Sequence, residues 1–459
     1  MPKWTCERAI GRASQPVQGG LGSPPYLDDS ARPLREPLRL AYFARGLDGL
    51  FLPAVAGCEA FALLRAGSPE EQWAGSLVSR KQSLVYRLPE YELNPYPSTG
   101  DVLRDSNIAQ LLKRNQISAL LLSSSFTAQV RAWADRHEIR VLAADYEHQQ
   151  RLENKLWFDR FLARHRIPKP TSAVVIAGST PSPATSVSIR SAVVQQADSQ
   201  GGEGTFFLDS LAEWPALVER LALPRGERLL ARQFVPGRPL GITVFTAPGI
   251  VALSAVRLQC YYPRRSGAAQ RLFAGVQWLP TGELPARLRN QINVVFQRLG
   301  ELLYGRRYFG FANYDFLADD SDRVWVIECN PRMSAATPHL LANSELSGGV
   351  PLGRLFLEGF QGQAKWPRRF EFSQLPASRF AGATLDITSQ AADAQVTRRD
   401  FPCGRRTREA FTLFPMAGKW QLAAPETTLA TILSDVRLFG DSGKLNAAGR
   451  RLVQRFRYT

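Results

Sequence analysis

The stretch from Phe309 to Arg332 constrains the fold most strongly, because two apolar, β-prone runs flank a short polar turn. The runs read FGFANYDFLA and RVWVIECN, and DDSD separates them. This pattern predicts an antiparallel strand pair. The second strand ends on a carboxylate, an amide, a proline and an arginine, and half-buried polar groups at a strand end need partners.

The polar side chains of this hairpin are of the kind that holds a hard cation. Asp315 precedes the turn, and Glu328 and Asn330 follow it two residues apart, so these two share a face of their strand. Two carboxylates and an amide oxygen suit Mg²⁺ or Mn²⁺. Arg332 would hold a phosphoryl or carboxylate oxygen. Alternatively, Asp315 and Glu328 are solvated edge charges and Arg332 pairs with one of them.

Composition argues against several other classes of protein. The chain has 459 residues, 44% hydrophobic and 21% charged, as expected of two or three globular domains. Four histidines and five scattered cysteines leave little material for a zinc site or a Ser-His-Asp hydrolase. The net charge of +16 comes mostly from scattered arginines, so we expect no specific nucleic-acid partner. With no membrane-length apolar run and no secretory signal, we expect a cytoplasmic protein without a membrane partner.

Periodicity divides the chain into four parts. Residues 1–37, rich in Pro, Gly and Ser, predict a flexible leader. Residues 38–150 alternate strand and helix patterns, which predicts a parallel sheet covered by helices. Residues 151–374 begin with a helix, RLENKLWFDRFLARHRI, and continue with strands and an amphipathic helix over 284–304. Residues 375–459 predict short strands, turns and a basic final helix.

A glycine-rich loop forms the second constellation. In SAVVQQADSQGGEGTFFL, two β-prone runs flank Gly201, Gly202 and Gly204. Such a loop can fold over phosphates with its backbone N–H groups exposed. It does not open a helix, so it is neither a Walker loop nor a dinucleotide fingerprint, and a plain hairpin turn explains it equally well.

Taken together, residues from about 150 to 360 resemble the ATP-grasp superfamily, particularly biotin carboxylase and the large chain of carbamoyl-phosphate synthase. The resemblance rests on the segments NKLWFDRFLARHRIPKPT, VVQQADSQGGEGT, LLARQFVPG, NYDFL and IECNPR. It implies an α/β protein in which a parallel pre-ATP-grasp domain precedes a two-lobed ATP-grasp domain over 151–374. The lid lobe would span about 156–235, and a small β-rich module would follow.

The resemblance also implies roles for individual residues. Asp315, Glu328 and Asn330 would hold two Mg²⁺ (or Mn²⁺) ions that bridge the phosphates of ATP. Arg332 would be the catalytic residue that steadies the transferring phosphoryl group or an acyl phosphate. The ATP-binding residues would be Lys155, Gln195, Gly201, Gly202, Gly204, Thr205, Gln233, Phe234 and Val235.

Two positions depart from the superfamily's pattern. A Lys or Arg that touches the phosphates usually ends the strand before the glycine loop, and Gln195 (or Gln196, one residue on) stands there. The adenine strand, RQFVPG, also lacks its usual Glu. Arg190, Arg232 or Arg257 would be needed to compensate.

The reaction that the resemblance implies is ATP-dependent ligation of a carboxylate to an amine. ATP converts a small-molecule carboxylate into an acyl phosphate, and an amine captures it to form an amide or peptide bond. Arg257 and Arg271, in VRLQCYYPRRSGAAQR, are candidates for binding the substrate carboxylate, although a solvated basic loop is an equal alternative. The competing interpretation is a catalytically decayed ATP-binding regulatory or scaffold protein. Either interpretation is compatible with a homodimer.

Overall fold

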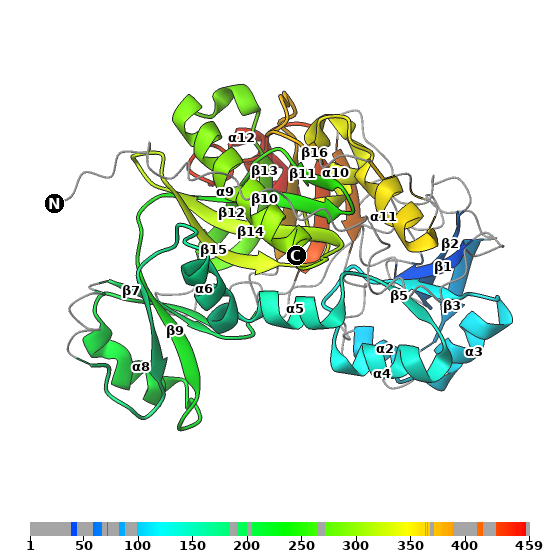
Figure 1. Cartoon of the computed structure of the whole chain (residues 1–459), viewed down its shortest axis with the longest axis horizontal. Helices are drawn as coiled ribbons and strands as arrows, with labels where there is room; N and C mark the ends of the chain where they lie inside the picture. The colour runs from blue at the N-terminus through cyan, green and yellow to red at the C-terminus, as the bar shows by residue number, and fades with distance from the viewer. Residues whose placement is uncertain are drawn as a thin grey trace.

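The computed structural model shows an α/β chain built on three β-sheets, which confirms the predicted fold class (Figure 1). The leader predicted over 1–37 lies outside the described residues. The described residues are 38–43, 58–66, 71, 82–87, 99–182, 189, 191–199, 204–263, 271–362, 364, 366–367, 371–388, 411–415 and 428–455. Across them, no helix has the length and hydropathy needed to span a membrane.

The first sheet has five parallel strands in the order β3-β2-β1-β4-β5. Its elements are β1 (Leu38–Phe43), β2 (Cys58–Arg65), β3 (Ser83–Tyr86), α2 (Thr99–Leu103), α3 (Ser106–Arg114), β4 (Ala119–Leu121), α4 (Ala128–His137) and β5 (Arg140–Leu142). Side chains alternate along β1: Ala41 packs with the helices, whereas Leu40 and Tyr42 pack with residues from beyond 300. Both faces are therefore buried, as in most parallel sheets.

The helix predicted to begin at 151 is two helices, so that prediction is wrong in detail. Helix α5 (Tyr146–Glu153) ends where α6 (Lys155–Arg164) begins, and Asn154 is both the C-cap of the first and the N-cap of the second. The backbone of Asn154 is extended, and its side chain accepts a hydrogen bond from the Trp157 amide. A side-chain cap of this kind favours starting a new helix over continuing the old one.

A small antiparallel sheet forms a lobe of its own, at the lower left of Figure 1. Its strands run in the order β6-β9-β7-β8, and α8 covers one face. Trp214 of this helix is buried against the sheet in a separate small core. The elements are β6 (Ser172–Ile176), β7 (Ala192–Gln196), β8 (Thr205–Leu208), α8 (Trp214–Arg220) and β9 (Arg228–Gln233). Strands β7 and β8 are paired across the glycine-rich loop.

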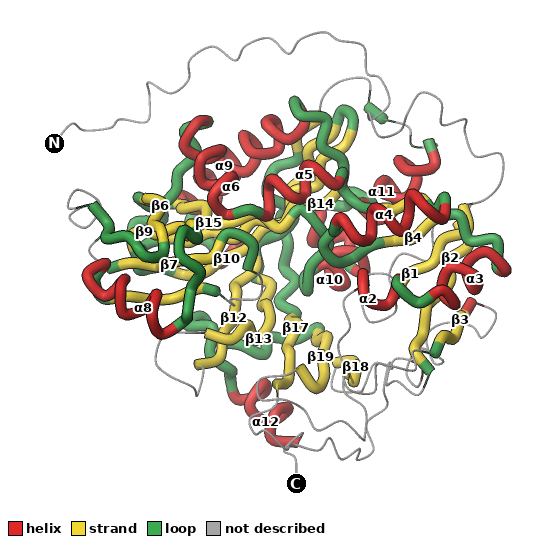
Figure 2. The backbone as a smooth tube through the Cα atoms, turned by 90° about the horizontal axis from the view of Figure 1, so that it is seen from below, coloured by secondary structure: helices red, strands yellow, loops and turns green. Residues whose placement is uncertain are grey.

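The third sheet has ten strands and is mostly antiparallel. The main path runs β15-β14-β10-β12-β13-β17-β19-β18, and the C-terminal strands continue it, as Figure 2 shows. Its strands are β10 (Arg238–Ala247), β11 (Ile250–Leu253), β12 (Arg257–Pro263), β13 (Arg271–Trp278), β14 (Gly310–Ala318), β15 (Val324–Asn330), β16 (Glu371–Phe372), β17 (Ala383–Thr388), β18 (Phe411–Pro415) and β19 (Thr428–Ser434). The remaining helices are α9 (Ala286–Tyr304), α10 (Thr337–Ala342), α11 (Leu352–Gln361) and α12 (Ala447–Arg455).

Candidate active site

The antiparallel pair of β14 and β15 brings the predicted cation-binding side chains together. Asp315 lies opposite Glu328, and Asn313 lies opposite Asn330. The register shifts between Asp315 and Phe316, which marks a bulge beside the two carboxylates. Bulges re-aim side chains and are common next to binding sites.

Asp315 and Glu328 are close enough for each to change the titration of the other. Burial, and then the negative charge of Glu328, raise the pKa of Asp315 well above its usual value. Burial also acts to raise the pKa of Glu328, but the Lys155 ammonium, 3.5 Å away, and hydrogen bonds from Asp315 and Asn330 lower it overall. The two carboxyls therefore titrate as a coupled pair, in which Asp315 holds its proton to a higher pH than Glu328.

This donor set fits a hard divalent cation. Asp315 and Glu328 lie opposite one another, and a cation bound between two carboxylates would relieve their mutual repulsion. No group of three His, Cys, Asp or Glu side chains gathers as a metal site in the described part of the chain. The site would therefore depend on two carboxylates and the amide oxygen of Asn330, all of them oxygen donors.

Arg332 lies beside this cluster and is already paired. Its Nε donates to Glu153 Oε1 at 2.8 Å and to Ser125 Oγ at 3.2 Å, and its Nη2 donates to Asn330 Oδ1 at 3.1 Å. Glu153 ends α5, and Ser125 follows β4 of the parallel sheet. Three parts of the fold thus meet at one guanidinium group.

A cavity of about 270 Å³ opens between the small sheet and the large one. Most of the predicted ATP-binding residues line it, and they are Lys155, Gln195, Thr205, Gln233, Phe234 and Val235. Asp315 and Glu328 also line it, and Phe207 contacts Phe234 edge to face, with ring centroids 6.2 Å apart. The cavity therefore has an aromatic wall from the small sheet and an acidic wall from the large one.

The backbone at Gln233–Val235 offers fewer hydrogen-bonding groups than the sequence suggested. The Gln233 amide donates to Thr171 O at 2.8 Å, and the Phe234 amide donates to Ser191 O at 2.7 Å. Both amides are thus used within the lobe. The adenine edge would have to meet the carbonyl groups and the amide of Val235.

The described end of the glycine-rich loop is shaped by Gly204. Its φ of +65° is left-handed, and a Cβ there would lie 2.4 Å from Gln196 Oε1, so the position favours glycine. Gly201 and Gly202 lie outside the described residues. Thr205 begins β8, and its hydroxyl accepts a hydrogen bond from Gln195 Nε2 at 3.3 Å.

A second cavity, of about 180 Å³, lies on the other side of the carboxylates and shares Asp315 and Glu328 with the first. Arg257 and Arg332 line it together with small side chains from 334 to 336. Arg257 is 2% exposed and donates to Thr243 Oγ1 at 3.1 Å and to Asn313 Oδ1 at 3.2 Å. Burial lowers its pKa to about 10, with Asp315 opposing the shift. The side chain of Arg271 lies outside what the structure describes.

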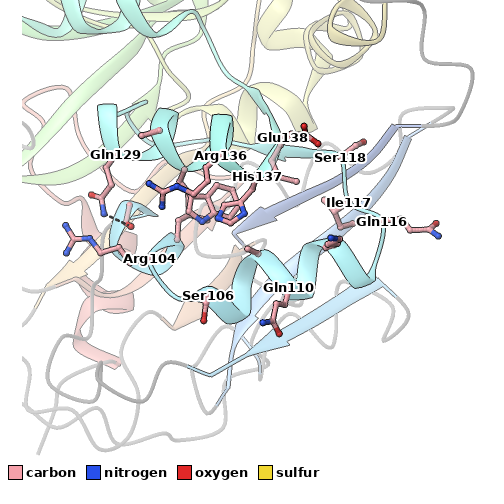
Figure 3. Close-up of a pocket in the computed structure, with 17 residues that line it drawn as sticks. Arg104, Ser106, Gln110, Gln116, Ile117, Ser118, Gln129, Arg136, His137 and Glu138 are labelled. Atoms are coloured by element: carbon pink, nitrogen blue, oxygen red, sulfur yellow. Dashed lines mark hydrogen bonds between the residues drawn. The ribbon is translucent and has the colours of Figure 1, made fainter.

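A larger cavity than either of these lies elsewhere, in a groove between α3 and α4 (Figure 3). It measures about 1180 Å³ and shares no lining residue with the other two cavities. Its charged side chains Arg104, Lys113, Arg136 and Glu138 are exposed, and Arg104 pairs with Asp101 at 3.5 Å. Solvated charges do not converge on a ligand as the half-buried cluster does, so the carboxylate cluster is the better candidate site.

Sequence reasoning missed Glu153, Ser125 and Gln259. Gln259 Nε2 donates a hydrogen bond to Asp315 Oδ1, and its Oε1 accepts one from the Tyr261 hydroxyl. The signal for Gln259 was its place in the strand before the predicted basic loop. Glu153 and Ser125 gave no sequence signal, because they reach Arg332 only through tertiary packing.

Comparison with known proteins decides the fold. No family model matches the sequence, and no curated protein matches it. Among solved structures, biotin carboxylase from Campylobacter jejuni in complex with β,γ-ATP superposes with a TM-score of 0.61 at 14% identity, over 87% of this chain and 88% of that one. The chain has the ATP-grasp fold.

Two further structures with the ATP-grasp fold also superpose on this chain. The biotin carboxylase domain of 2-oxoglutarate carboxylase from Hydrogenobacter thermophilus, with MgADP and bicarbonate, gives a TM-score of 0.61 at 13% identity, over 87% of this chain and 86% of that one. Carboxyaminoimidazole ribonucleotide synthase from Aspergillus clavatus, with ATP, gives 0.57 at 13% identity, over 92% and 99%. The predicted resemblance to ATP-grasp proteins is therefore confirmed at the level of the fold.

Proposed function

We propose that this protein is an ADP-forming carboxylate–amine ligase that uses Mg-ATP to activate a small-molecule carboxylate. The observation that carries the proposal is that Asp315 and Glu328 line both cavities, while Asn330 lines the smaller one together with Arg257 and Arg332. Solved structures with this fold hold ATP, or MgADP with bicarbonate, which supports a nucleotide as the ligand of the larger cavity.

Each side of the cluster has a separate task. The nucleotide would lie against Phe234 and Lys155 with its phosphates toward Asp315 and Glu328, which would hold Mg²⁺ together with Asn330. When bound, Mg²⁺ supplies charge neutralisation for the transferring phosphoryl group. The acceptor carboxylate would lie in the smaller cavity, where Arg257 and Arg332 compensate its charge.

A carboxylate must be activated before an amine can attack it, because an oxide would otherwise have to leave. Transfer of the γ-phosphoryl group to the carboxylate releases ADP and creates an acyl phosphate, which has a good leaving group. The amine then attacks the acyl carbon, loses a proton, and phosphate departs. The lobe formed by β6–β9 would have to cover the nucleotide during this step, so that water does not hydrolyse the acyl phosphate.

A regulatory ATP-binding protein is the second candidate, and two observations favour it. Gln195 is neutral, and Arg332 is already paired with Glu153 and does not line the larger cavity. An arginine held in this way could be a structural ion pair. The two candidates differ in whether bound ATP is turned over.

The deciding experiment is a screen for ADP release. Purified protein with Mg-ATP is given pairs of small carboxylates and amines, amino acids included, and the products of positive pairs are identified by mass spectrometry. A ligase releases ADP and phosphate only with a matching pair and yields a product joined through an amide. Binding of Mg-ATP without ADP release for every pair supports the regulatory candidate, and absence of ATP binding rejects both.

A further inference from the structure

Arg232 is a buried cation that the carboxylate cluster does not use. It lies on β9, is 2% exposed, and donates from Nη1 to Gln195 Oε1 at 2.8 Å. Its Nε lies 3.5 Å from Asp159 Oδ1. Its Nη2 is buried and has no hydrogen-bond partner among the described residues. A buried guanidinium N–H without a partner lowers the stability of the fold, so a ligand that accepts a hydrogen bond from it would offset part of this penalty.

The position of Arg232 points to the ligand. It lines the cavity of about 270 Å³, and among the described residues there only Lys155 is also a cation. Lys155 is already occupied by Glu328 and by the carbonyl oxygen of Ser199. Burial lowers the pKa of Arg232, but Asp159 and Glu328 oppose this, and a guanidinium stays charged at neutral pH.

The neutral side chain at position 195 is explained by its contact with Arg232. Its amide oxygen accepts from Arg232, and its amide nitrogen donates to the Thr205 hydroxyl. A lysine at 195 would place a second cation at hydrogen-bonding distance from the guanidinium, in a buried site, where like charges repel strongly. The neutral amide on β7 and the cation on β9 are therefore complementary.

Asp159 fixes the guanidinium from the side of α6. It is itself held by Lys169 at 3.0 Å and by the Ser172 hydroxyl at 2.7 Å. Asp159 therefore pairs with two cations, Lys169 and Arg232, and one carboxylate cannot neutralise both, so positive charge is left for a further anion.

We propose that Arg232 binds the phosphate chain of the nucleotide through Nη2, and that it supplies from β9 the cation that Gln195 does not supply from β7. This inference rests on the proposed function only in taking a nucleoside polyphosphate as the ligand. Arg232 is then a substrate-binding residue, Gln195 orients it, and the two departures seen in the sequence compensate one another.

The test measures affinity for adenosine, AMP, ADP and Mg-ATP by titration calorimetry. Arg232→Gln should weaken Mg-ATP and ADP by about 10- to 100-fold, the scale of a lost charge-assisted hydrogen bond, and should leave adenosine unchanged. Arg228→Gln is the matched control, because Arg228 is on the same strand, exposed, and outside the cavity. Arg232→Lys, which keeps the charge, should retain affinity within several-fold, and thermal unfolding of each variant reports on folding.

A second pair of variants tests the complementarity. Gln195→Lys alone should weaken Mg-ATP binding, and adding Arg232→Gln to it should restore affinity toward that of wild type. The inference is overturned if Arg232→Gln binds Mg-ATP as wild type does, or if it weakens adenosine as much as ATP, which would indicate a structural role. Failure of wild type to bind any nucleotide would overturn the proposed function as well, and so is distinguishable from failure of Arg232 alone.

Discussion

Glu328 is the residue at which the charges of the site converge. It lies opposite Asp315, pairs with Lys155 at 3.5 Å, and accepts from Asn330 Nδ2 at 3.4 Å. Glu328→Gln keeps the size and the hydrogen bonds but removes the charge that a divalent cation needs, so turnover should fall on the order of 100-fold and require more Mg²⁺. The measurement is ADP release as a function of Mg²⁺ concentration.

Asp320→Asn is the control for this change. Asp320 lies exposed in the turn of the same hairpin, so its charge should not matter. If Glu328→Gln turns over ATP with the Mg²⁺ dependence of wild type, the cation site is assigned to the wrong residues.

Arg332 should act on turnover more than on nucleotide affinity. It lines the smaller cavity and not the cavity proposed for the nucleotide, so in the proposed reaction its charge would meet the acceptor and the transferring group. Arg332→Ala should leave Mg-ATP affinity within several-fold while turnover falls by roughly two to three orders of magnitude, because the lost interaction forms in the transition state. Calorimetry and ADP release measure the two effects.

Glu153→Gln separates the charge of Arg332 from its placement. The glutamine can still accept from Arg332 Nε, so a smaller loss of turnover than that of Arg332→Ala is expected. Equal loss of nucleotide affinity and turnover in Arg332→Ala would show that the arginine is structural.

Asp386 predicts how stability depends on pH. Burial raises its pKa to about 6, although Thr431 Oγ1 donates to it at 2.7 Å. The pKa of an aspartate in the unfolded chain is about 3.9. Between this pH and about 6 the folded chain binds a proton that the unfolded chain has lost, so the free energy of unfolding falls as pH rises from about 4 through about 6. Asp386→Asn, which keeps the acceptor and has no charge, should be more stable than wild type by roughly 1–2 kcal/mol at pH 7.5 and similar to it at pH 4.

Chemical denaturation at several pH values measures this difference. A gap between wild type and variant that stays constant from pH 4 to pH 7.5 would mean that Asp386 does not titrate in this window.

At the scale of elements, the junction of α5 and α6 positions both Lys155 and Glu153, the partner of Arg332. Asn154 caps α6 through the Trp157 amide at 2.9 Å, and its Nδ2 donates to Asp198 Oδ1 at 2.9 Å. Asn154→Ala should lower the free energy of unfolding by about 1 kcal/mol, the usual effect of losing an N-cap.

Asn154→Ser is the matched comparison, because serine restores the cap but is too short to replace the contact with Asp198. Its stability, measured by urea denaturation, should lie closer to that of wild type than that of the alanine variant. An alanine variant as stable as wild type would show that packing alone holds the junction.

At the scale of the whole molecule, the C-terminal strands are part of the large sheet. Strand β17 pairs with β13, and buried Gln277 donates to Ala381 O at 2.6 Å and to Gly382 O at 2.9 Å while accepting from the Leu438 amide at 2.9 Å. A chain that ends at Leu375 would leave the edge of β13 and Gln277 without these partners, and buried unpaired groups cost about 1–3 kcal/mol each.

We therefore expect the chain that ends at Leu375 to unfold at a markedly lower temperature than the full chain, or to aggregate through the exposed edge of β13. A chain that ends at Arg455 keeps every described residue and is the control. Thermal unfolding followed by circular dichroism measures the effect, and an unchanged midpoint for the shorter chain would show that the C-terminal strands contribute little.

The sequence was informative where neighbouring residues decide the structure. The pairing of Asp315 with Glu328 could be predicted, because a short turn aligns two adjacent strands and alternation sets which side chains share a face. Alternating strand and helix patterns predicted the parallel sheet, because parallel strands need a crossover connection that is usually a helix. The break at Asn154 was missed, since the helical pattern runs through it and only the side-chain cap distinguishes two helices from one.

Contacts between distant segments were decided by the tertiary structure alone. Gln195 meets Arg232 from 37 residues away, Gln259 meets Asp315 from 56, and Glu153 meets Arg332 from 179. The sequence could show that position 195 lacks a cation, but not which arginine lies beside it. The strand order β6-β9-β7-β8 places Arg232 of β9 next to Gln195 of β7. Residue types and local register are written along the chain, whereas the charge around each site depends on which strands become neighbours.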